Sequence, residues 1–197
     1  MAKLQKSIEK KEALINATIT LVNNDGFHAA PMSKIAKMAN VSPATIYLYF
    51  KSKQDLVNQT YLQVKNAFTA YAFETYDEKM PVEDSFKMIW FRIAEFKFRD
   101  CERGLFLAQC DNTPMIDESS RQEGIKNLKP LLDLWKKGKE QGIIKPVSDY
   151  LLYAYTVNPL SYLMMIKKRN AFVPTEENIN EAYQLAWDSI KVNKTNK

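Results

Sequence analysis

Histidine and cysteine are scarce in this chain of 197 residues. His28 is the only histidine, and Cys101 and Cys110 are the only cysteines. Three such residues cannot supply the four ligands of a structural zinc site, and a Ser-His-Asp triad would have to use His28, although the chain contains no nucleophile-elbow pattern. We therefore expect no catalytic site, no metal site and no cofactor. His28 is interpreted as a surface-loop residue, and the cysteines as small apolar residues outside any disulfide framework.

Long apolar runs are absent as well, and none approaches the length that spans a membrane. The N-terminus is basic, but Asn16 and Thr18 interrupt the apolar stretch that follows it, so no signal peptide is predicted. With 46% hydrophobic and 26% charged residues, the composition is that of an ordinary globular protein. We expect a cytoplasmic protein that has no contact with a membrane.

Glycine is rare, with five residues, and strand signals are few, whereas long stretches show helical spacing. These features predict an all-α protein of about nine helices. Pro130 and Pro159 fall inside two of the helical patterns, and each is expected to kink or divide its helix. The helices are expected at about residues 7–24, 32–39, 43–50, from 53 onward, 81–100, 103–110, 117–141, 148–169 and from 175 onward.

Positive charge is concentrated near the N-terminus. Residues 1–60 contain eight lysines and four acidic residues, a net charge of +4, whereas the rest of the chain has 20 basic and 19 acidic residues. Such a distribution is typical of a segment that binds a polyanion. By itself it is a weak signal, because a few lysines often only solvate a surface.

Residues 31–56 have the pattern of a helix-turn-helix. Asn40 stands where the chain must turn sharply, and asparagine tolerates the left-handed conformation better than most other residues. Ser42 can cap the next helix, and Pro43 occupies its first position, where a missing N–H costs nothing. A helix, a three-residue turn and a second helix, with small or apolar residues inside, is the architecture of this DNA-binding motif.

The second of these helices, residues 43–50, has one face for the core and one for a partner. Ile46 and Phe50 point inward together. An exposed Leu48 beside an exposed Tyr47 suits the major groove of DNA, where apolar groups meet thymine methyls and hydroxyls reach bases or phosphates. The alternative is that Tyr47 and Leu48 pack on the first helix. The outward face and its flanks consist of Ala44, Thr45, Tyr47 and Leu48.

A longer pattern with rigid spacing runs through residues 14–56. It consists of Gly26-Phe27, Ile35-Ala36, Ala39, Val41-Ser42, Tyr47, Tyr49-Phe50, Lys53 and Leu56. In this pattern the chain resembles the N-terminal domain of the TetR family of transcriptional regulators. It departs from the family at Ala30 and Pro31, where a capping Ser or Thr is usual, and at Asn40, which replaces the usual turn glycine. Further on, the run KPLLDLWKKGKEQGIIKP resembles the seventh helix of the family.

The resemblance implies a homodimer that binds a palindromic operator in double-stranded DNA, with a C-terminal domain that binds a small-molecule effector. It divides the chain into a helix-turn-helix domain, residues 1–52, and a regulatory and dimerisation domain, residues 53–197. Because the recognition helix lacks Arg, Asn and Gln, DNA shape is expected to add to the discrimination. By position, the resemblance places Ser33, Pro43, Ala44, Thr45 and Leu48 near bases and Tyr47, Tyr49 and Lys53 near phosphates, and Lys34 and Ser42 complete the expected DNA-binding residues.

Aromatic residues are abundant beyond residue 67, and they suit a bundle core, a dimer interface or, for a subset, an apolar effector pocket. The expected function is transcriptional regulation, as a repressor that a small molecule releases from its operator. The alternative is a DNA-binding regulator whose C-terminal domain only dimerises or binds a protein partner. A helical enzyme that happens to contain the motif is disfavoured by the single histidine. The expected dimer interface consists of Leu151, Leu152, Tyr155, Tyr162, Leu163, Tyr183, Leu185, Trp187 and Ile190.

Overall fold

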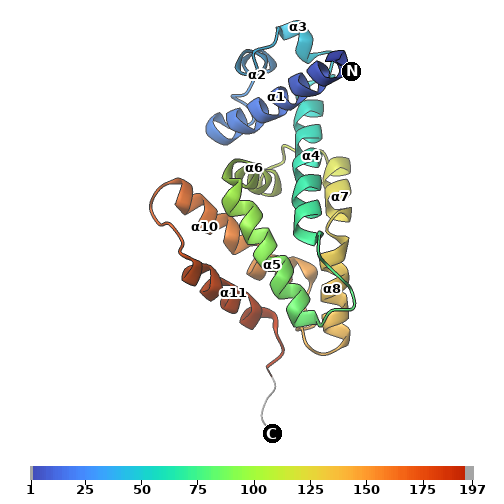
Figure 1. Ribbon diagram of the computed structural model, residues 1–197, viewed down its shortest axis with the longest axis vertical. Coiled ribbons are helices and arrows are strands. Elements are labelled where there is room, and N and C mark those ends of the chain that lie inside the picture. The colour runs from blue at the N-terminus through green and yellow to red at the C-terminus, as the bar shows by residue number, and fades with distance from the viewer. Residues whose placement is uncertain (1, 194–197) are drawn as a thin grey trace. The chain divides into compact units, whose positions relative to one another are not determined.

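The computed structural model in Figure 1 describes residues 2–193, and the side chains of these residues except 2, 3 and 112. Within this range the chain is all-helical, and the only β-type pairing is an isolated antiparallel bridge between Ile144 and Lys191. None of the described helices is both long and apolar enough to cross a membrane. The helices are α1 (Ala2–Asp25), α2 (Met32–Met38), α3 (Pro43–Ile46), α4 (Lys53–Phe73), α5 (Val82–Arg99), α6 (Cys101–Asn112), α7 (Glu118–Lys126), α8 (Lys129–Glu140), α9 (Asp149–Thr156), α10 (Asn158–Lys168) and α11 (Glu176–Ile190).

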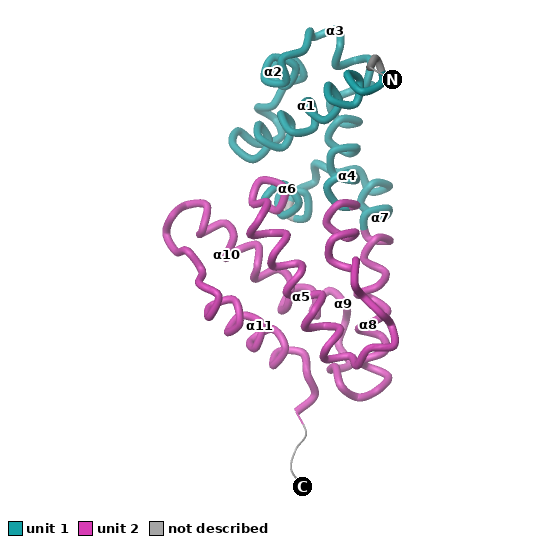
Figure 2. The backbone as a smooth tube through the Cα atoms, in the orientation of Figure 1, with its two compact units in different colours: residues 1–65, 105–124 teal, residues 66–104, 125–197 magenta. Residues whose placement is uncertain are grey.

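The chain forms two compact units, which Figure 2 shows in teal and magenta. Unit 1 consists of residues 1–65 and 105–124, and unit 2 consists of residues 66–104 and 125–197. The boundaries between the units fall inside α4, α6 and α7. The division into functional domains at residue 52 remains a prediction.

Two prolines account for the number of helices. Pro130 lies in the first turn of α8 and Pro159 in the first turn of α10, where a proline removes no intrahelical hydrogen bond. Each of the two long segments expected around these prolines is therefore divided in two, which turns about nine expected helices into the eleven of the described range. The helical class and the dividing role of both prolines are confirmed.

In both units, local sequence signals determine where helices begin and end. Gly26 ends α1 with φ +80°, and its N–H donates to the Val22 carbonyl at 3.0 Å. Gly142, which follows the end of α8, also has a left-handed backbone conformation, with φ +66°. At the start of α11, Thr175 and Asn178 form a reciprocal capping box, in which the Asn178 N–H donates to the Thr175 hydroxyl at 3.2 Å.

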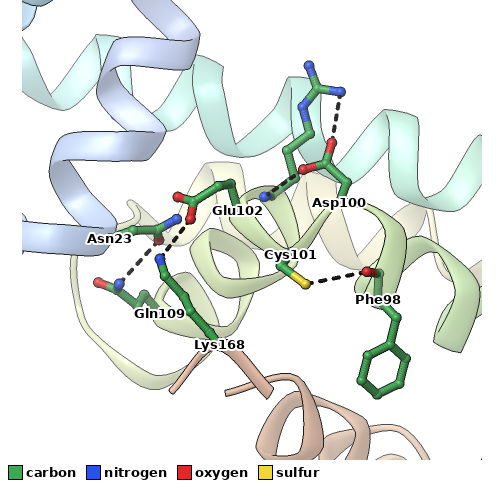
Figure 3. Close-up of polar contacts among 8 residues, drawn as sticks. Asn23, Phe98, Asp100, Cys101, Glu102, Gln109 and Lys168 are labelled. Carbon is green, nitrogen blue, oxygen red and sulfur yellow. Dashed lines mark hydrogen bonds and ion pairs between the residues drawn. The ribbon is translucent and has the colours of Figure 1, made fainter. Parts of the chain in front are cut away.

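The two cysteines lie in α6, and Figure 3 shows the polar contacts around Cys101. Cys110 is buried in unit 1, and burial raises the pKa of its thiol well above the usual value. Cys101 is half-buried in unit 2 and donates to the Phe98 carbonyl at 3.4 Å. The two residues that follow Cys101 form ion pairs within unit 2, Glu102 with Lys168 at 2.7 Å and Arg103 with Asp100 at 3.4 Å. The interpretation of the cysteines as small buried or semi-buried apolar residues fits both positions.

The core of unit 2 is built around α5, which lies among α8, α10 and α11 (Figure 1). Trp90 of α5 is fully buried, and its indole N–H donates to the Thr156 carbonyl at the end of α9, at 2.8 Å. Aromatic rings of α11 pack against the same helix: the centroid of Tyr183 lies 5.6 Å from that of Trp90, in an edge-to-face arrangement, and the centroid of Trp187 lies 5.5 Å from that of Phe86. Burial raises the pKa of Tyr183 to about 12.

Within unit 1, α7 approaches α4 closely at a glycine. A Cβ atom added to Gly124 would lie 2.8 Å from Cε1 and Cζ of Tyr61, a fully buried ring that cannot move aside easily. Burial also raises the pKa of Tyr61 to about 12. Gly124 is therefore required by the close packing of the two helices.

We expect Gly124→Ala to lower the free energy of unfolding by about 1–2 kcal/mol, because overpacking outweighs the helix propensity gained with alanine. Chemical denaturation should show a lower midpoint, while Glu123→Ala, at an exposed position of the same helix, should change it little. In a Tyr61→Leu background the ring is gone, and Gly124→Ala should then cost nothing. An equal loss in both backgrounds would show that Tyr61 is not the cause.

Candidate nucleic-acid interface

The turn between α2 and α3 has the geometry that its sequence predicts. Asn40 has φ +54°, in the left-handed region, which confirms the conformation expected of it. Its N–H donates to the Lys37 carbonyl at 3.1 Å, and the Val41 N–H donates to the Ala36 carbonyl at 3.0 Å. These bonds form the end of α2 and turn the chain towards α3.

Helix α3 begins at a complete cap. The Ser42 hydroxyl accepts a hydrogen bond from the Thr45 N–H at 3.1 Å and lies 2.8 Å from the Thr45 hydroxyl. Pro43 follows at the first position of the helix. The capping roles expected of Ser42 and Pro43 are confirmed.

The prediction of a helix to residue 50 is wrong, because α3 ends at Ile46. The backbone continues in tighter turns, in which Leu48 N–H donates to the Thr45 carbonyl and Tyr49 N–H to the Ile46 carbonyl, both at 3.1 Å. Of the six residues from Thr45 to Phe50, all except Leu48 are β-branched or aromatic and have weak helix propensity, which favours this early end. Phe50 N–H still reaches the Ile46 carbonyl at 3.0 Å, so the two side chains share one side.

The two sides of this segment differ sharply in exposure. Ile46 and Phe50 are buried, with 0% and 1% of their surfaces exposed, as predicted. Tyr47 is 59% exposed and Leu48 is 80% exposed, so neither packs on α1. Pro43 and Ala44 are exposed beside them, and Thr45 is half-buried. The segment therefore exposes a face that carries apolar groups and hydroxyls, while the buried Ile46 and Phe50 anchor it to the core.

Tyr49, in contrast, is held by the first helix. Its side chain is half-buried, and its hydroxyl lies 3.1 Å from the hydroxyl of Ser7 in α1. The alternative of packing against α1, considered for Tyr47 and Leu48, therefore applies to Tyr49.

The cationic residues expected at DNA have partners within unit 1. Lys34 of α2 forms an ion pair with Asp25 at 2.5 Å, and Ser33 beside it is exposed. The Lys53 ammonium lies 4.3 Å from the centroid of the Phe27 ring and 3.4 Å from the His28 carbonyl oxygen. Partial burial lowers the pKa of Lys53.

Lys53 begins α4, whose start is fixed by its own cap. The Ser52 hydroxyl accepts from the Asp55 N–H at 3.1 Å, and the Asp55 carboxylate accepts from the Lys51 N–H at 2.7 Å. These two bonds form a capping box in a shifted form, in which the Asp55 carboxylate reaches the N–H of the residue before the cap. A hydrogen bond from the Gln59 amide, together with that of Lys51, lowers the pKa of Asp55.

Sequence reasoning left out two exposed lysines of the same segment. Lys37 lies on α2 one turn beyond Ser33, and Lys51 lies between α3 and α4. The concentration of lysine in the N-terminal third was the signal that could have included them. His28, by contrast, is exposed in the turn after α1, as expected for a surface-loop residue.

Comparison with known proteins decides the family. Residues 14–60 match the bacterial regulatory proteins of the tetR family, and residues 81–191, more than half of the chain, match a tetracyclin repressor-like C-terminal domain. The chain belongs to the TetR family. It is therefore a helix-turn-helix transcriptional regulator that binds DNA, and not an enzyme.

TetR-family relatives match along nearly the whole chain. An HTH-type transcriptional regulator of Haemophilus influenzae is 26% identical over 188 residues, which cover 95% of this chain and 98% of the relative. The crystal structure of a TetR family regulator from Marinobacter aquaeolei is 25% identical, with a TM-score of 0.88 over 98% of this chain and 100% of that one. FadR of Bacillus subtilis, solved with stearoyl-CoA, shares the fold at 20% identity, with a TM-score of 0.69 over 91% of this chain and 98% of that one.

We expect neighbouring leucine and isoleucine side chains of the recognition segment to differ in their effect on stability. Ile46→Ala should lower the free energy of unfolding by about 2–5 kcal/mol, because it leaves a cavity in the core. Leu48→Ala removes an exposed side chain and should change it by less than about 0.5 kcal/mol. Chemical denaturation of the two variants measures both values. A comparable loss for Leu48→Ala would contradict the exposure of this residue.

Proposed function

We propose that this TetR-family regulator is a cytoplasmic repressor that binds a palindromic operator as a homodimer and is released by a small-molecule effector. The observation that carries the proposal is the exposed face of Tyr47 and Leu48 on a segment anchored by buried Ile46 and Phe50. A short, rigid helical segment with such a face has the form that enters a major groove.

The DNA contacts that we propose fall into two groups. Ser33, Pro43, Ala44, Thr45 and Leu48 read base edges, and the exposure of Leu48 suits contact with a thymine methyl. Tyr47, Tyr49 and Lys53 bind phosphates, flanked by Lys34 and Ser42. Lys34 and Lys53 have intramolecular partners in the free protein, so phosphate would compete with Asp25 and with the Phe27 ring.

A second copy of the chain is the proposed partner of unit 2. Four residues expected in the dimer interface, Leu152, Tyr183, Trp187 and Ile190, are instead buried in the core of the unit, because they pack among its own helices. The exposed members are Leu151, Tyr155, Tyr162 and Leu185, with exposed fractions of 48%, 63%, 60% and 73%, and Leu163 is half-buried. Leu151 and Tyr155 lie one turn apart on α9 and form an exposed apolar stripe there, and Tyr162 is exposed on α10. Exposed apolar side chains of this kind favour a self-complementary contact.

The effector is proposed to bind in the C-terminal part of the chain. A cavity of about 340 Å³ lies in unit 2, and it favours an effector over a domain that only dimerises. FadR of Bacillus subtilis, which shares the fold, holds stearoyl-CoA. Effector binding and operator binding are then coupled, and each weakens the other by the same factor.

Two substitutions separate base reading from phosphate binding. Leu48→Ala should weaken operator binding by about 1–3 kcal/mol and leave binding to scrambled duplex unchanged. Lys53→Gln should weaken both and reduce the slope of log affinity against log salt by about one phosphate contact. Titrations of both duplexes at several salt concentrations measure these effects.

Lys79→Gln is the matched control, because it removes one positive charge at an exposed loop position of unit 2. It should leave the salt slope unchanged. If Leu48→Ala weakens both duplexes equally, or Lys53→Gln weakens only the operator, the assigned roles are wrong.

The dimer is tested by a charge placed in the exposed stripe. Light scattering of the native protein should report twice the 22.8 kDa of one chain. Tyr155→Arg should shift the mass towards the monomer and weaken operator binding, because desolvating an unpaired charge opposes association. Leu4→Arg, at a 68% exposed position of α1, should leave the dimer intact. A dimer insensitive to Tyr155→Arg would place the interface elsewhere.

A further inference from the structure

The first turns of α1 contact the segment of residues 43–50, whose exposed face we propose to enter the major groove. The Ser7 hydroxyl lies 3.1 Å from the Tyr49 hydroxyl, in a partly buried contact. One turn further along α1, the Lys11 ammonium lies 5.8 Å from the centroid of the Phe50 ring. These residues all belong to unit 1, so the two contacts place the start of α1 beside the proposed DNA-facing surface.

The side of α1 next to these contacts carries exposed lysines. Lys6 and Lys10 lie one turn apart, and Lys10 also lies one turn after Ser7, so the three share one side of the helix. Among the described side chains, none forms a hydrogen bond or an ion pair with either ammonium. Unlike Lys34 and Lys53, both can therefore bind an anion without giving up an existing contact.

The acidic residues of the same turns bind amides on the other side of the helix. The Glu9 carboxylate accepts a hydrogen bond from the Gln5 amide at 3.2 Å, and the Glu12 carboxylate accepts one from the Gln63 amide of α4 at 2.7 Å. Helical spacing puts Gln5 and Glu12 nearly opposite to Lys10. The side of α1 that borders Tyr49 therefore carries lysines and no acidic residue.

The contact between Ser7 and Tyr49 leaves one hydroxyl proton for a ligand. In a hydrogen bond between two hydroxyls one donates and the other accepts, and the accepting hydroxyl still has its own proton to donate to a third group. Both residues are half-buried, so solvent and ligands can reach the pair. A donor beside an ammonium suits a phosphate oxygen, because hydrogen bonds to ionised acceptors are the strong ones.

We infer that Ser7, Tyr49 and Lys10 form a binding site for a phosphate of the DNA backbone, and Lys6 extends the site by one turn of α1. Contacts of this kind add affinity for any sequence and fix the position of the protein on the duplex. The three α1 residues precede residue 14, where the match to the tetR family begins. The inference deepens the proposed function, on which it rests for the phosphate contact of Tyr49.

The probe is a fluorescently labelled duplex of scrambled sequence, bound by full-length protein at several salt concentrations. Lys6→Gln and Lys10→Gln should each reduce the slope of log affinity against log salt by about 0.9 per bound chain, which corresponds to one phosphate contact. Ser7→Ala should weaken binding about threefold at an unchanged slope, because a neutral hydroxyl displaces no counterion. Ser7→Thr keeps the hydroxyl and should bind as the native protein does.

The matched control moves the charge around the helix. Gln5→Lys, added to Lys10→Gln, restores the net charge of α1 but places the ammonium on the opposite side. It should not restore the salt slope. If it does, these lysines act only through the net charge of the protein, and the inference is overturned. A native slope in both Lys6→Gln and Lys10→Gln would overturn it as well.

A second arm separates DNA from another polyanionic surface. Leu4 and Ile8, with exposed fractions of 68% and 49%, lie among the same lysines, a combination that also suits an anionic membrane. Sedimentation with vesicles of equal parts phosphatidylglycerol and phosphatidylcholine should leave the protein in solution. Vesicle binding that Lys10→Gln abolishes, together with a native salt slope on duplex, would assign this side of α1 to a membrane and overturn the inference.

Failure of this site and failure of the proposed function give different results. If Lys10→Gln keeps the native slope while Lys53→Gln loses one contact, the proposed phosphate role of Lys53 stands and the α1 site fails. If Lys10→Gln loses one contact while Leu48→Ala weakens operator and scrambled duplex equally, the α1 site stands and the proposed base reading fails.

Discussion

Burial of Ile46 and Phe50 is the constraint on which the DNA-facing surface depends. These two side chains fix a segment that contains only one short turn of α-helix, α3, and whose own hydrogen bonds could not hold it alone. Their spacing decides which neighbours remain outside. Tyr47 and Leu48 face solvent because the positions on either side of them are committed to the core. The exposed face is therefore a consequence of packing beneath it.

Much of this surface could be predicted from sequence, because the determining interactions are local. The left-handed turn at Asn40 and the cap at Ser42 depend on residues within three positions of each other. The division of helices at Pro130 and Pro159 follows from the missing N–H of proline. In the same way, the alternation of buried and exposed side chains around Ile46 follows from helical spacing.

The remaining features depend on contacts between residues far apart in the chain. The bond between Tyr49 and Ser7, and the position of Lys53 over Phe27, have no signature in spacing or composition. The end of α3 at Ile46 results from competition between weak helix propensity and tertiary packing, which periodicity does not weigh. The face offered to a second copy was only partly predictable, because an apolar helix in a bundle gives no indication of which residues its own chain covers, as Trp187 shows.

The hydrogen bond from Trp90 to the Thr156 carbonyl ties a side chain of one helix to a break in another. At this break the Leu160 N–H turns to the Val157 carbonyl, at 3.2 Å, and does not continue the ladder to Thr156. The indole thus satisfies an acceptor that an unbroken helix would satisfy by itself. In an unbroken helix the Leu160 N–H would take this carbonyl, and the indole of Trp90 would then lose its acceptor.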